Sequence, residues 1–111
     1  MITGVHSIVY SPDADALRAF FRDVLGFPSV DAGGGWLIFG LPPAELAAHP
    51  AEASGSDLYL MCDDLEATMA DLRAKGVELG PVGDQGWGRV TTIALPDGGE
   101  LGLYEPRHPR P

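Results

Sequence analysis

The sequence predicts an α+β fold in which two tandem βαβββ units form a curved, cleft-bearing mixed sheet with the helices outside. Short apolar runs of strand character alternate with amphipathic helical segments, and glycines and prolines fall between these segments. The same order of elements then occurs a second time. Asp13 precedes Gly26 by 13 residues and Asp63 precedes Gly76 by 13, so both landmarks recur after 50 residues.

The first unit is expected to begin with a strand at 5–10 that leads into a helix. Ser11 offers an N-cap hydroxyl, and Pro12 suits the first helical turn. Asp13 places an acid near the positive end of the helix dipole. Gly26 is expected to end the helix in the left-handed conformation. The apolar residues of this helix recur on one face, and they are Leu17, Phe20, Phe21, Val24 and Leu25.

Two further strands of the first unit are predicted at 28–30 and 36–41, with a triple-glycine turn at 33–35 between them. The second of these strands is almost entirely apolar, so we expect it to be buried. Within it, Trp36 and Phe39 are expected to belong to the core.

The second unit follows the same order. A strand at 58–62 leads to a helix that Asp63 or Asp64 caps and Gly76 ends. The apolar residues of this helix are Leu65, Met69 and Leu72.

Two strands around 90–95 and 100–104 complete the second unit, and the Pro-Asp-Gly-Gly turn at 96–99 joins them as a hairpin. We expect one domain over 1–111. Its predicted parts are unit one at about 2–43, a linker at about 44–56, unit two at about 57–106, and an extended tail at 107–111.

The composition excludes several classes of protein. A chain of 111 residues has the length of one domain. Its single cysteine, Cys62, excludes an internal disulfide and a thiolate zinc site. The 16 acidic and 7 basic side chains give a formal net charge of −9. This balance argues against a nucleic acid partner, because phosphate binding needs clustered Lys and Arg.

Membrane and secreted classes are also disfavoured. The longest apolar stretch, 36–41, is far shorter than the roughly 20 residues that a membrane span needs. The N-terminal sequence has neither the basic region nor the apolar region of a signal peptide. We therefore expect no membrane partner and a cytoplasmic location.

The order and spacing of these motifs resemble the vicinal oxygen chelate superfamily, which includes glyoxalase I, bleomycin resistance proteins and extradiol dioxygenases. The resemblance covers residues 2–106, nearly the whole chain. The segments that carry it are 6–10 leading to Asp13, then 20–27, 57–64, 75–77, 87–89 and 95–99.

This resemblance implies a site at the floor of the cleft. In the metalloenzymes of the family, a divalent metal binds one residue from the first strand and one from the last strand of each unit. The substrate's adjacent oxygens chelate the metal, which stabilises an enolate or activates dioxygen. Members with two units per chain commonly form homodimers, so a homodimer is expected here as well.

Two of the four ligand positions that the resemblance implies carry no donor. His6 matches the first ligand, and Asp57 stands at the corresponding position of the second unit. Gly102, however, occupies the position of the family's glutamate, and strand 36–41 contains no carboxylate, imidazole or amide. No metal is therefore favoured. A rearranged divalent metal site would need His6 and Asp57 together with Glu105, or with Glu45 and His49 on the linker.

Several candidate residues also have an ordinary structural explanation. His6 is either a ligand or general base or a core histidine, and Asp57 is either a ligand or part of a turn. Trp87 either stacks on a planar ligand or covers the core. Arg89 either binds an anion or forms a surface ion pair. The candidate ligand-binding residues are His6, Asp57, Trp87, Arg89, Gly102 and Tyr104, of which His6 and Tyr104 are also catalytic candidates.

The leading hypothesis is a protein that binds a small organic molecule in its cleft without the family's full metal site, as the resistance proteins of the superfamily do. The alternative is a divalent-metal-dependent lyase, isomerase or dioxygenase acting on a small oxygenated substrate. A third hypothesis is a metal-free catalyst with His6 as base and Tyr104 or Arg89 as electrophile. The sequence does not decide between binding and catalysis.

Overall fold

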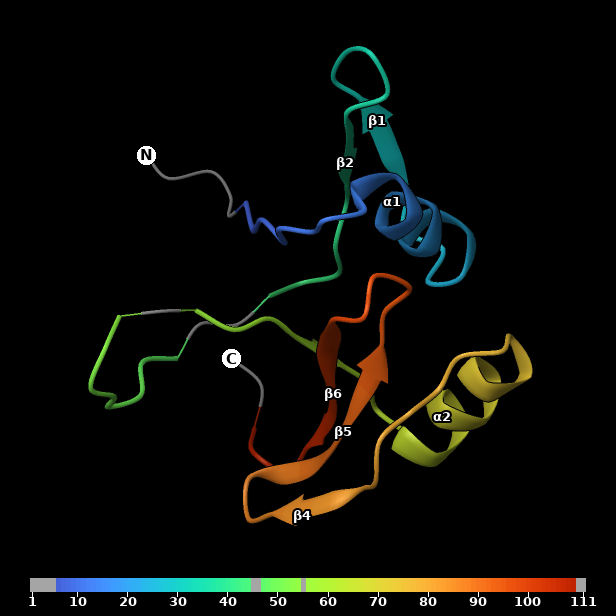
Figure 1. The fold of residues 1–111 in the computed structure, drawn as a ribbon. Coiled ribbons are helices and arrows are strands. Elements are labelled where there is room, and N and C mark those ends of the chain that lie inside the picture. Colours follow the sequence, from blue (N-terminus) through green and yellow to red (C-terminus); the bar gives the residue numbers. More distant parts are fainter. Residues whose placement is uncertain (1–5, 45–46, 55, 110–111) are drawn as a thin grey trace.

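A computed structural model describes residues 6–44, 47–54 and 56–109. Its helices and strands form two groups, one from each half of the chain (Figure 1). The α+β class is therefore as predicted. The elements are α1 (Ala14–Asp23), β1 (Ser29–Asp31), β2 (Leu37–Phe39), β3 (Tyr59–Met61), α2 (Leu65–Ala74), β4 (Gly83–Gln85), β5 (Gly88–Ala94) and β6 (Glu100–Pro106).

The second unit has the predicted βαβββ order and forms one mixed sheet. Its strands lie in the order β3-β6-β5-β4. The first strand pairs in parallel with the last, so that Tyr59 lies opposite Gly102, whereas β5 and β6 are antiparallel. The predicted hairpin turn joins them, with Gly98 at φ +88°. The short strand β4, whose position the sequence had not indicated, pairs with the other side of β5.

One face of this sheet is covered and the other is open. Side chains alternate between the two faces of a strand, and along β6 the residues Leu101 and Leu103 are buried against α2. Gly102 and Tyr104 therefore face the opposite side. The buried core consists of Leu17, Leu65, Met69, Leu72, Val77, Ile93, Leu95, Leu101 and Leu103.

The helix α2 begins and ends at the residues that the sequence indicates. Asp64, rather than Asp63, is the N-cap, and its Oδ1 accepts a hydrogen bond from the Ala67 N–H at 3.0 Å. Gly76 follows the helix at φ +83°, in the conformation expected of a C-terminal glycine.

The helix α1 has a different N-cap from the expected one. Asp13 caps it by accepting a hydrogen bond from the Ala16 N–H at 3.1 Å. The Ser11 hydroxyl instead accepts a hydrogen bond from the Asp13 N–H, outside the helix. Gly26 has the predicted positive φ, +71°.

The first unit has fewer strands than predicted. Residues 6–10 run into α1 without forming a strand, so the prediction for 5–10 is wrong over its described part. In the described first half of the chain, β1 and β2 pair only with each other. Pro42 and Pro43 follow soon after β2, and because proline has no backbone N–H, they cannot continue a ladder there.

The expectation that 36–41 is a buried strand is also wrong. The strand β2 is shorter, and Trp36, with 66% of its surface exposed, lies outside the core. The Arg18 guanidinium carbon lies 4.8 Å from the centre of the Trp36 ring, a cation–π contact at the surface. A run of apolar residues has the pattern of a buried strand whether or not another layer of the protein covers it. Here one side of the 36–41 segment is left uncovered.

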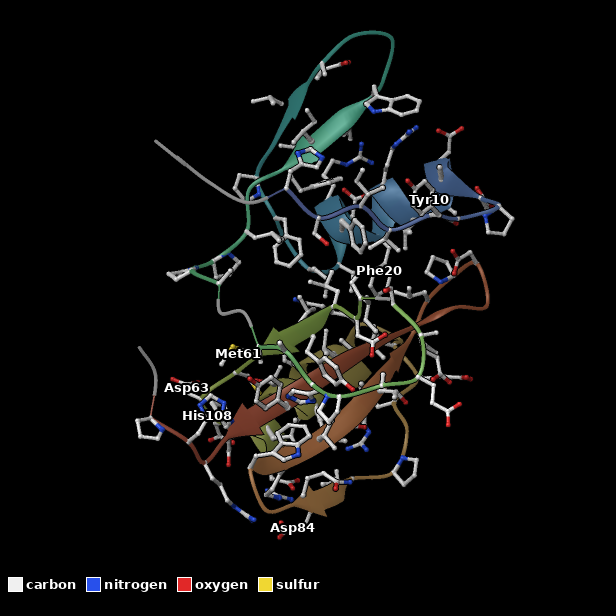
Figure 2. The ribbon with its side chains drawn as sticks, turned by 90° about the vertical axis from the view of Figure 1, so that its left-hand side faces the viewer. Tyr10, Phe20, Met61, Asp63, Asp84 and His108 are labelled. Atoms are coloured by element: carbon white, nitrogen blue, oxygen red, sulfur yellow. The ribbon has the colours of Figure 1, made fainter. Side chains whose placement is uncertain are left out.

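The two units are joined by apolar packing and by polar contacts. Leu17 of α1 is buried in the core of the second unit, and Phe20 packs at its edge, between the units (Figure 2). The Ser11 hydroxyl donates a hydrogen bond to Asp97 in the β5–β6 turn. Lys75 reaches back to the Val24 carbonyl at 3.4 Å. Neither helix found in the described residues is long and apolar enough to span a bilayer.

The contact at Asp97 predicts a pH-dependent part of the stability. The hydrogen bonds from Ser11 and from the Gly99 N–H lower the pKa of Asp97 below its ordinary value. The stabilisation is then fully present above the unfolded-state pKa of about 3.9 and is lost as the pH falls through the folded-state value. Asp97→Asn should be less stable than the wild type at neutral pH, and the gap should shrink below about pH 4. Urea unfolding across this pH range measures it.

The control for this prediction is Glu52→Gln, which removes the same charge from an exposed position on the linker. It should not change how stability depends on pH. A gap between wild type and Asp97→Asn that keeps the same size at acid pH would contradict the prediction.

Candidate functional site

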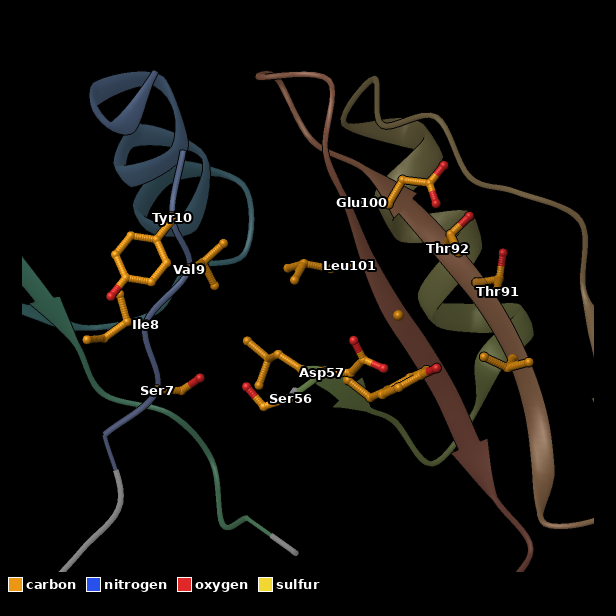
Figure 3. A pocket seen from close by; sticks show the side chains of 14 residues that line it. Ser7, Ile8, Val9, Tyr10, Ser56, Asp57, Thr91, Thr92, Glu100 and Leu101 are labelled. Atoms are coloured by element: carbon orange, nitrogen blue, oxygen red, sulfur yellow. The ribbon is translucent and has the colours of Figure 1, made fainter. Parts of the chain in front are cut away.

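A hollow of about 650 Å³ lies between the N-terminal segment 7–10 and the second sheet. Figure 3 shows Ser7 to Tyr10 on one side and residues of β5 and β6 on the other, with Ser56 and Asp57 below. Its described lining residues are Ser7, Ile8, Val9, Tyr10, Ser56, Asp57, Leu58, Tyr59, Val90, Thr91, Thr92, Glu100, Leu101 and Gly102. Both units contribute to it, as expected of a cleft between repeats.

The surface of this hollow is mixed in character. Two carboxylates, Asp57 and Glu100, line it together with the hydroxyls of Ser7, Ser56 and Thr92. Apart from Thr91 and Gly102, aliphatic and aromatic side chains form the rest. Such a combination of apolar surface and a few polar groups is typical of sites for small organic molecules.

The ring of Tyr59 occupies the space above Gly102. A Cβ atom at Gly102 would lie 2.2 Å from Tyr59 Cδ1 and 2.4 Å from its Cε1, which is far closer than atoms can approach. The parallel register places these two residues side by side on the open face. Only glycine at this position leaves room for the ring, so any larger side chain requires Tyr59 to move.

Three aromatic rings form a cluster on the open face next to the hollow. The rings of Trp87 and Tyr104 have centroids 5.1 Å apart and meet edge to face at 80°. Tyr59 makes similar contacts with Tyr104 at 6.0 Å and with Trp87 at 6.5 Å. Edge-to-face packing of this kind is favourable for aromatic rings. The cluster holds Tyr59 in place over Gly102, although Tyr59 and Trp87 remain 46% and 44% exposed.

Tyr104 also contacts a residue of the C-terminal segment. Its hydroxyl lies 3.3 Å from Nε2 of His108, and the two rings are 6.1 Å apart. The third hypothesis from the sequence has His6 as base and Tyr104 or Arg89 as electrophile, whereas the structure brings Tyr104 to His108.

The predicted site residues lie at different distances from the hollow. Asp57 and Gly102 line the hollow, while Trp87 and Tyr104 adjoin it through Tyr59. His6 is exposed and lies one residue before the lining begins. The structure therefore gathers four of the six candidates around one surface.

Arg89 lies on the other face of the sheet. Its guanidinium group donates a hydrogen bond to the Glu66 carboxylate on α2 at 2.6 Å. This hydrogen bond raises the pKa of Arg89 above its ordinary value. Arg89 thus has the surface ion pair that was its alternative explanation, and it is directed away from the hollow.

The residues suggested for a rearranged metal site do not come together. Glu105 faces α2, where its Oε1 accepts a hydrogen bond from the Leu65 N–H at 2.9 Å. Its carboxylate accepts a hydrogen bond from the first residue of α2. The first N–H groups of a helix have no partners within the helix, so this contact satisfies one of them. His49 is exposed on the linker, and Glu45 lies outside the described residues.

The donor set of the described residues therefore does not fit the family's metal. Gly102 offers no donor, the Tyr59 ring fills the space beside it, and Glu105 is engaged elsewhere. Among the residues that the structure describes, no three His, Cys, Asp or Glu side chains lie close enough to hold a metal ion.

Tyr59 is the functional candidate that the sequence analysis missed. A signal for it existed, because Tyr59 stands two residues after Asp57 and therefore faces the same side of a strand. Its position over Gly102 depends on the pairing of β3 with β6. That pairing joins residues that are far apart in the chain and could not be inferred from local pattern.

A smaller hollow of about 490 Å³ lies where β3 and β6 end, lined by Met61, Cys62, Asp63, Glu105, Pro106 and His108. Figure 2 shows Met61, Asp63 and His108 together at this end of the sheet. Burial raises the pKa of the Cys62 thiol, so the thiol stays protonated at neutral pH. Cys62 is accordingly a packing residue, as the sequence indicates.

The comparisons with known proteins agree with this fold. A family model described as the Glyoxalase/Bleomycin resistance protein/Dioxygenase superfamily matches residues 4–103. No curated protein matches the chain.

Among solved structures, TnmS3, an antibiotic binding protein from Streptomyces sp. CB03234, has a TM-score of 0.69 and 27% identity, and the match covers 95% of this chain and 97% of that one. A glyoxalase/bleomycin resistance protein from the same Streptomyces has a TM-score of 0.60 and 27% identity, covering 86% and 94%. Lactoylglutathione lyase from Agrobacterium tumefaciens has a TM-score of 0.66, with 95% of each chain covered. At 17% identity, that last likeness concerns the fold alone.

The contact between Tyr59 and Gly102 predicts a strong effect of a single methyl group. Gly102→Ala should lower the free energy of unfolding by about 1–3 kcal/mol, the usual cost of overpacking. The control is Gly86→Ala, because a Cβ atom at Gly86 meets nothing within 4 Å. Urea unfolding of both variants measures the difference.

A double variant separates this contact from other effects of the substitution. In a Tyr59→Ala background, Gly102→Ala should lower the free energy of unfolding by no more than about 0.5 kcal/mol. The ring that the new methyl group would displace is then absent. Equal losses for Gly102→Ala in both backgrounds would contradict the proposed contact.

Proposed function

Because the chain belongs to the Glyoxalase/Bleomycin resistance protein/Dioxygenase superfamily, we propose that it binds a small organic ligand without the family's full metal site. The ligand binds in the hollow between segment 7–10 and the open face of the second sheet. Asp57, Tyr59 and Gly102 contact it, and Trp87 and Tyr104 support the surface from the side.

The observation that carries this proposal is the position of the Tyr59 ring. The resemblance to metalloenzymes calls for a carboxylate at position 102, and Tyr59 fills that space. Where a metalloenzyme has a charged donor, this chain presents an aromatic surface. An aromatic surface favours stacking on a flat organic molecule.

The neighbours support binding as the activity. TnmS3, similar over nearly the whole of both chains, is described as an antibiotic binding protein. An antibiotic or a compound of comparable size is therefore the class of ligand we propose. The hollow, at about 650 Å³, falls within the roughly 300–1,000 Å³ range of sites for drug-sized molecules.

We further propose that the protein is a single cytoplasmic domain that forms homodimers. Several large apolar side chains of the first half are exposed, among them Val30, Ile38 and Leu41. A second copy would cover such residues, because exposed apolar patches commonly mark protein interfaces. Sedimentation equilibrium should then give twice the mass of one chain, and the mass of a single chain would contradict the dimer.

The proposal that the chain lacks the family's full metal site leads to a direct measurement. Untagged protein purified without chelator should contain far less than one divalent metal ion per chain in elemental analysis. His6→Ala should leave this content unchanged. Stoichiometric metal that is lost on His6→Ala would overturn the metal-free proposal and favour the metal-dependent enzyme.

Ligand binding has its own test. A set of aromatic antibiotics is screened by thermal shift, with Tyr59→Ala as the site variant and Trp36→Ala as the control, since Trp36 lies outside the hollow. Ligands of the hollow should raise the Tm of wild type and Trp36→Ala but not of Tyr59→Ala, because binding to the native state stabilises it. A screen in which no stabilising compound depends on Tyr59 would contradict binding at this site.

A further inference from the structure

The charge of the hollow is negative and uncompensated. Its two ionisable carboxylates, Asp57 and Glu100, are both exposed, and no Lys, Arg or His is among its described lining residues. Neither carboxylate forms an ion pair with another described residue. An anionic ligand would therefore meet repulsion here, with no positive group to offset it.

Most of the basic side chains of the described residues form ion pairs away from the hollow. Five of the six Lys and Arg side chains pair with acidic side chains, and none of these pairs involves a residue that lines the hollow. The pairs are Arg18–Asp15, Arg22–Asp23, Lys75–Asp71, Arg89–Glu66 and Arg107–Asp84. The sixth, Arg73, is exposed on α2 and does not line the hollow. None of these basic side chains lines the hollow, and the chain as a whole carries a formal net charge of −9.

The aromatic cluster also favours a positively charged ligand. The face of a Tyr or Trp ring has negative electrostatic potential and attracts cations within about 6 Å of its centre. Tyr59 lines the hollow directly and is 46% exposed, and Trp87 beside it is 44% exposed. The cluster therefore offers both stacking area and a cation–π contact.

The two carboxylates of the hollow lie close to the aromatic ring of Tyr59. Asp57 precedes Tyr59 by two residues, and both residues line the hollow. Glu100 precedes Gly102, the residue beneath the Tyr59 ring, by two residues on β6. A carboxylate thus stands just before β3 and another at the start of β6, the two neighbouring strands that carry the Tyr59–Gly102 contact.

We propose that the ligand of this hollow joins a flat aromatic ring to a cationic nitrogen, as in an aromatic compound with a protonated amine. The ring stacks on Tyr59, and the cation lies near Asp57 and Glu100. This inference rests on the proposed function, that the hollow binds a small organic molecule, and adds the chemical class of that molecule.

Three probes with one ring system and different charge test the inference. They are naphthylmethylamine, which is cationic at neutral pH, naphthylmethanol, which is neutral, and naphthoate, which is anionic. Isothermal titration calorimetry with the full chain should give the tightest binding for the amine, by roughly tenfold over the alcohol. The carboxylate should bind most weakly. Added salt should weaken binding of the amine and leave the alcohol unaffected.

Charge-removing variants assign the effect to the hollow. Asp57→Asn and Glu100→Gln should each weaken binding of the amine by about two- to fivefold and leave the alcohol unchanged. Glu78→Gln removes the same charge from an exposed position outside the hollow and should change neither. Tyr59→Ala should weaken all three probes, because it removes the stacking surface.

The possible results separate this inference from the proposed function. Equal binding of the three probes, all sensitive to Tyr59→Ala, would overturn the cationic class while supporting a small-molecule site. The cationic class would also be overturned if Glu78→Gln reduced the preference for the amine as much as Asp57→Asn does. The preference would then come from the net charge of the protein and not from the hollow. Failure of all three probes to bind would also overturn it, and the antibiotic screen would test the hollow independently.

Discussion

The parallel pairing of β3 with β6 is the constraint on which the site depends. It brings the first strand of the second unit beside its last strand and sets Tyr59 opposite Gly102. With a glycine at that position the Tyr59 ring lies over Gly102 and contacts Trp87 and Tyr104. The same alternation turns Leu101 and Leu103 to the other face, where α2 covers them. One register therefore determines both the core and the open aromatic surface.

The sequence predicts the second unit better than the first, for physical reasons. Around α2 the signals are local, since a capping aspartate and a glycine with positive φ mark its ends, and a Pro-Asp-Gly-Gly turn fixes the hairpin. In the first unit, the apolar run at 36–41 has the pattern of a buried strand. Burial, however, depends on whether another layer covers that strand, and no local pattern contains this information. Trp36 is exposed for that reason.

The site also contains some residues that local sequence pattern indicates and one that it does not. Asp57 and Gly102 could be picked out from their order in the chain, and both line the hollow. Arg89 and Glu105 could have been excluded by alternation along their strands, because both face α2. The role of Tyr59 needed the pairing of strands that lie more than 40 residues apart in the chain. Contacts of this range depend on the whole fold and are the part that the sequence alone does not reveal.

The burial of Leu17 makes the two halves of the chain depend on each other. Although the first half has fewer strands than the second, α1 inserts a side chain into the core that α2 and the second sheet build. The first half is therefore not an independent unit beside the second. A substitution on the buried face of α1 must fit a core that the second half provides, so it acts on the stability of both halves at once.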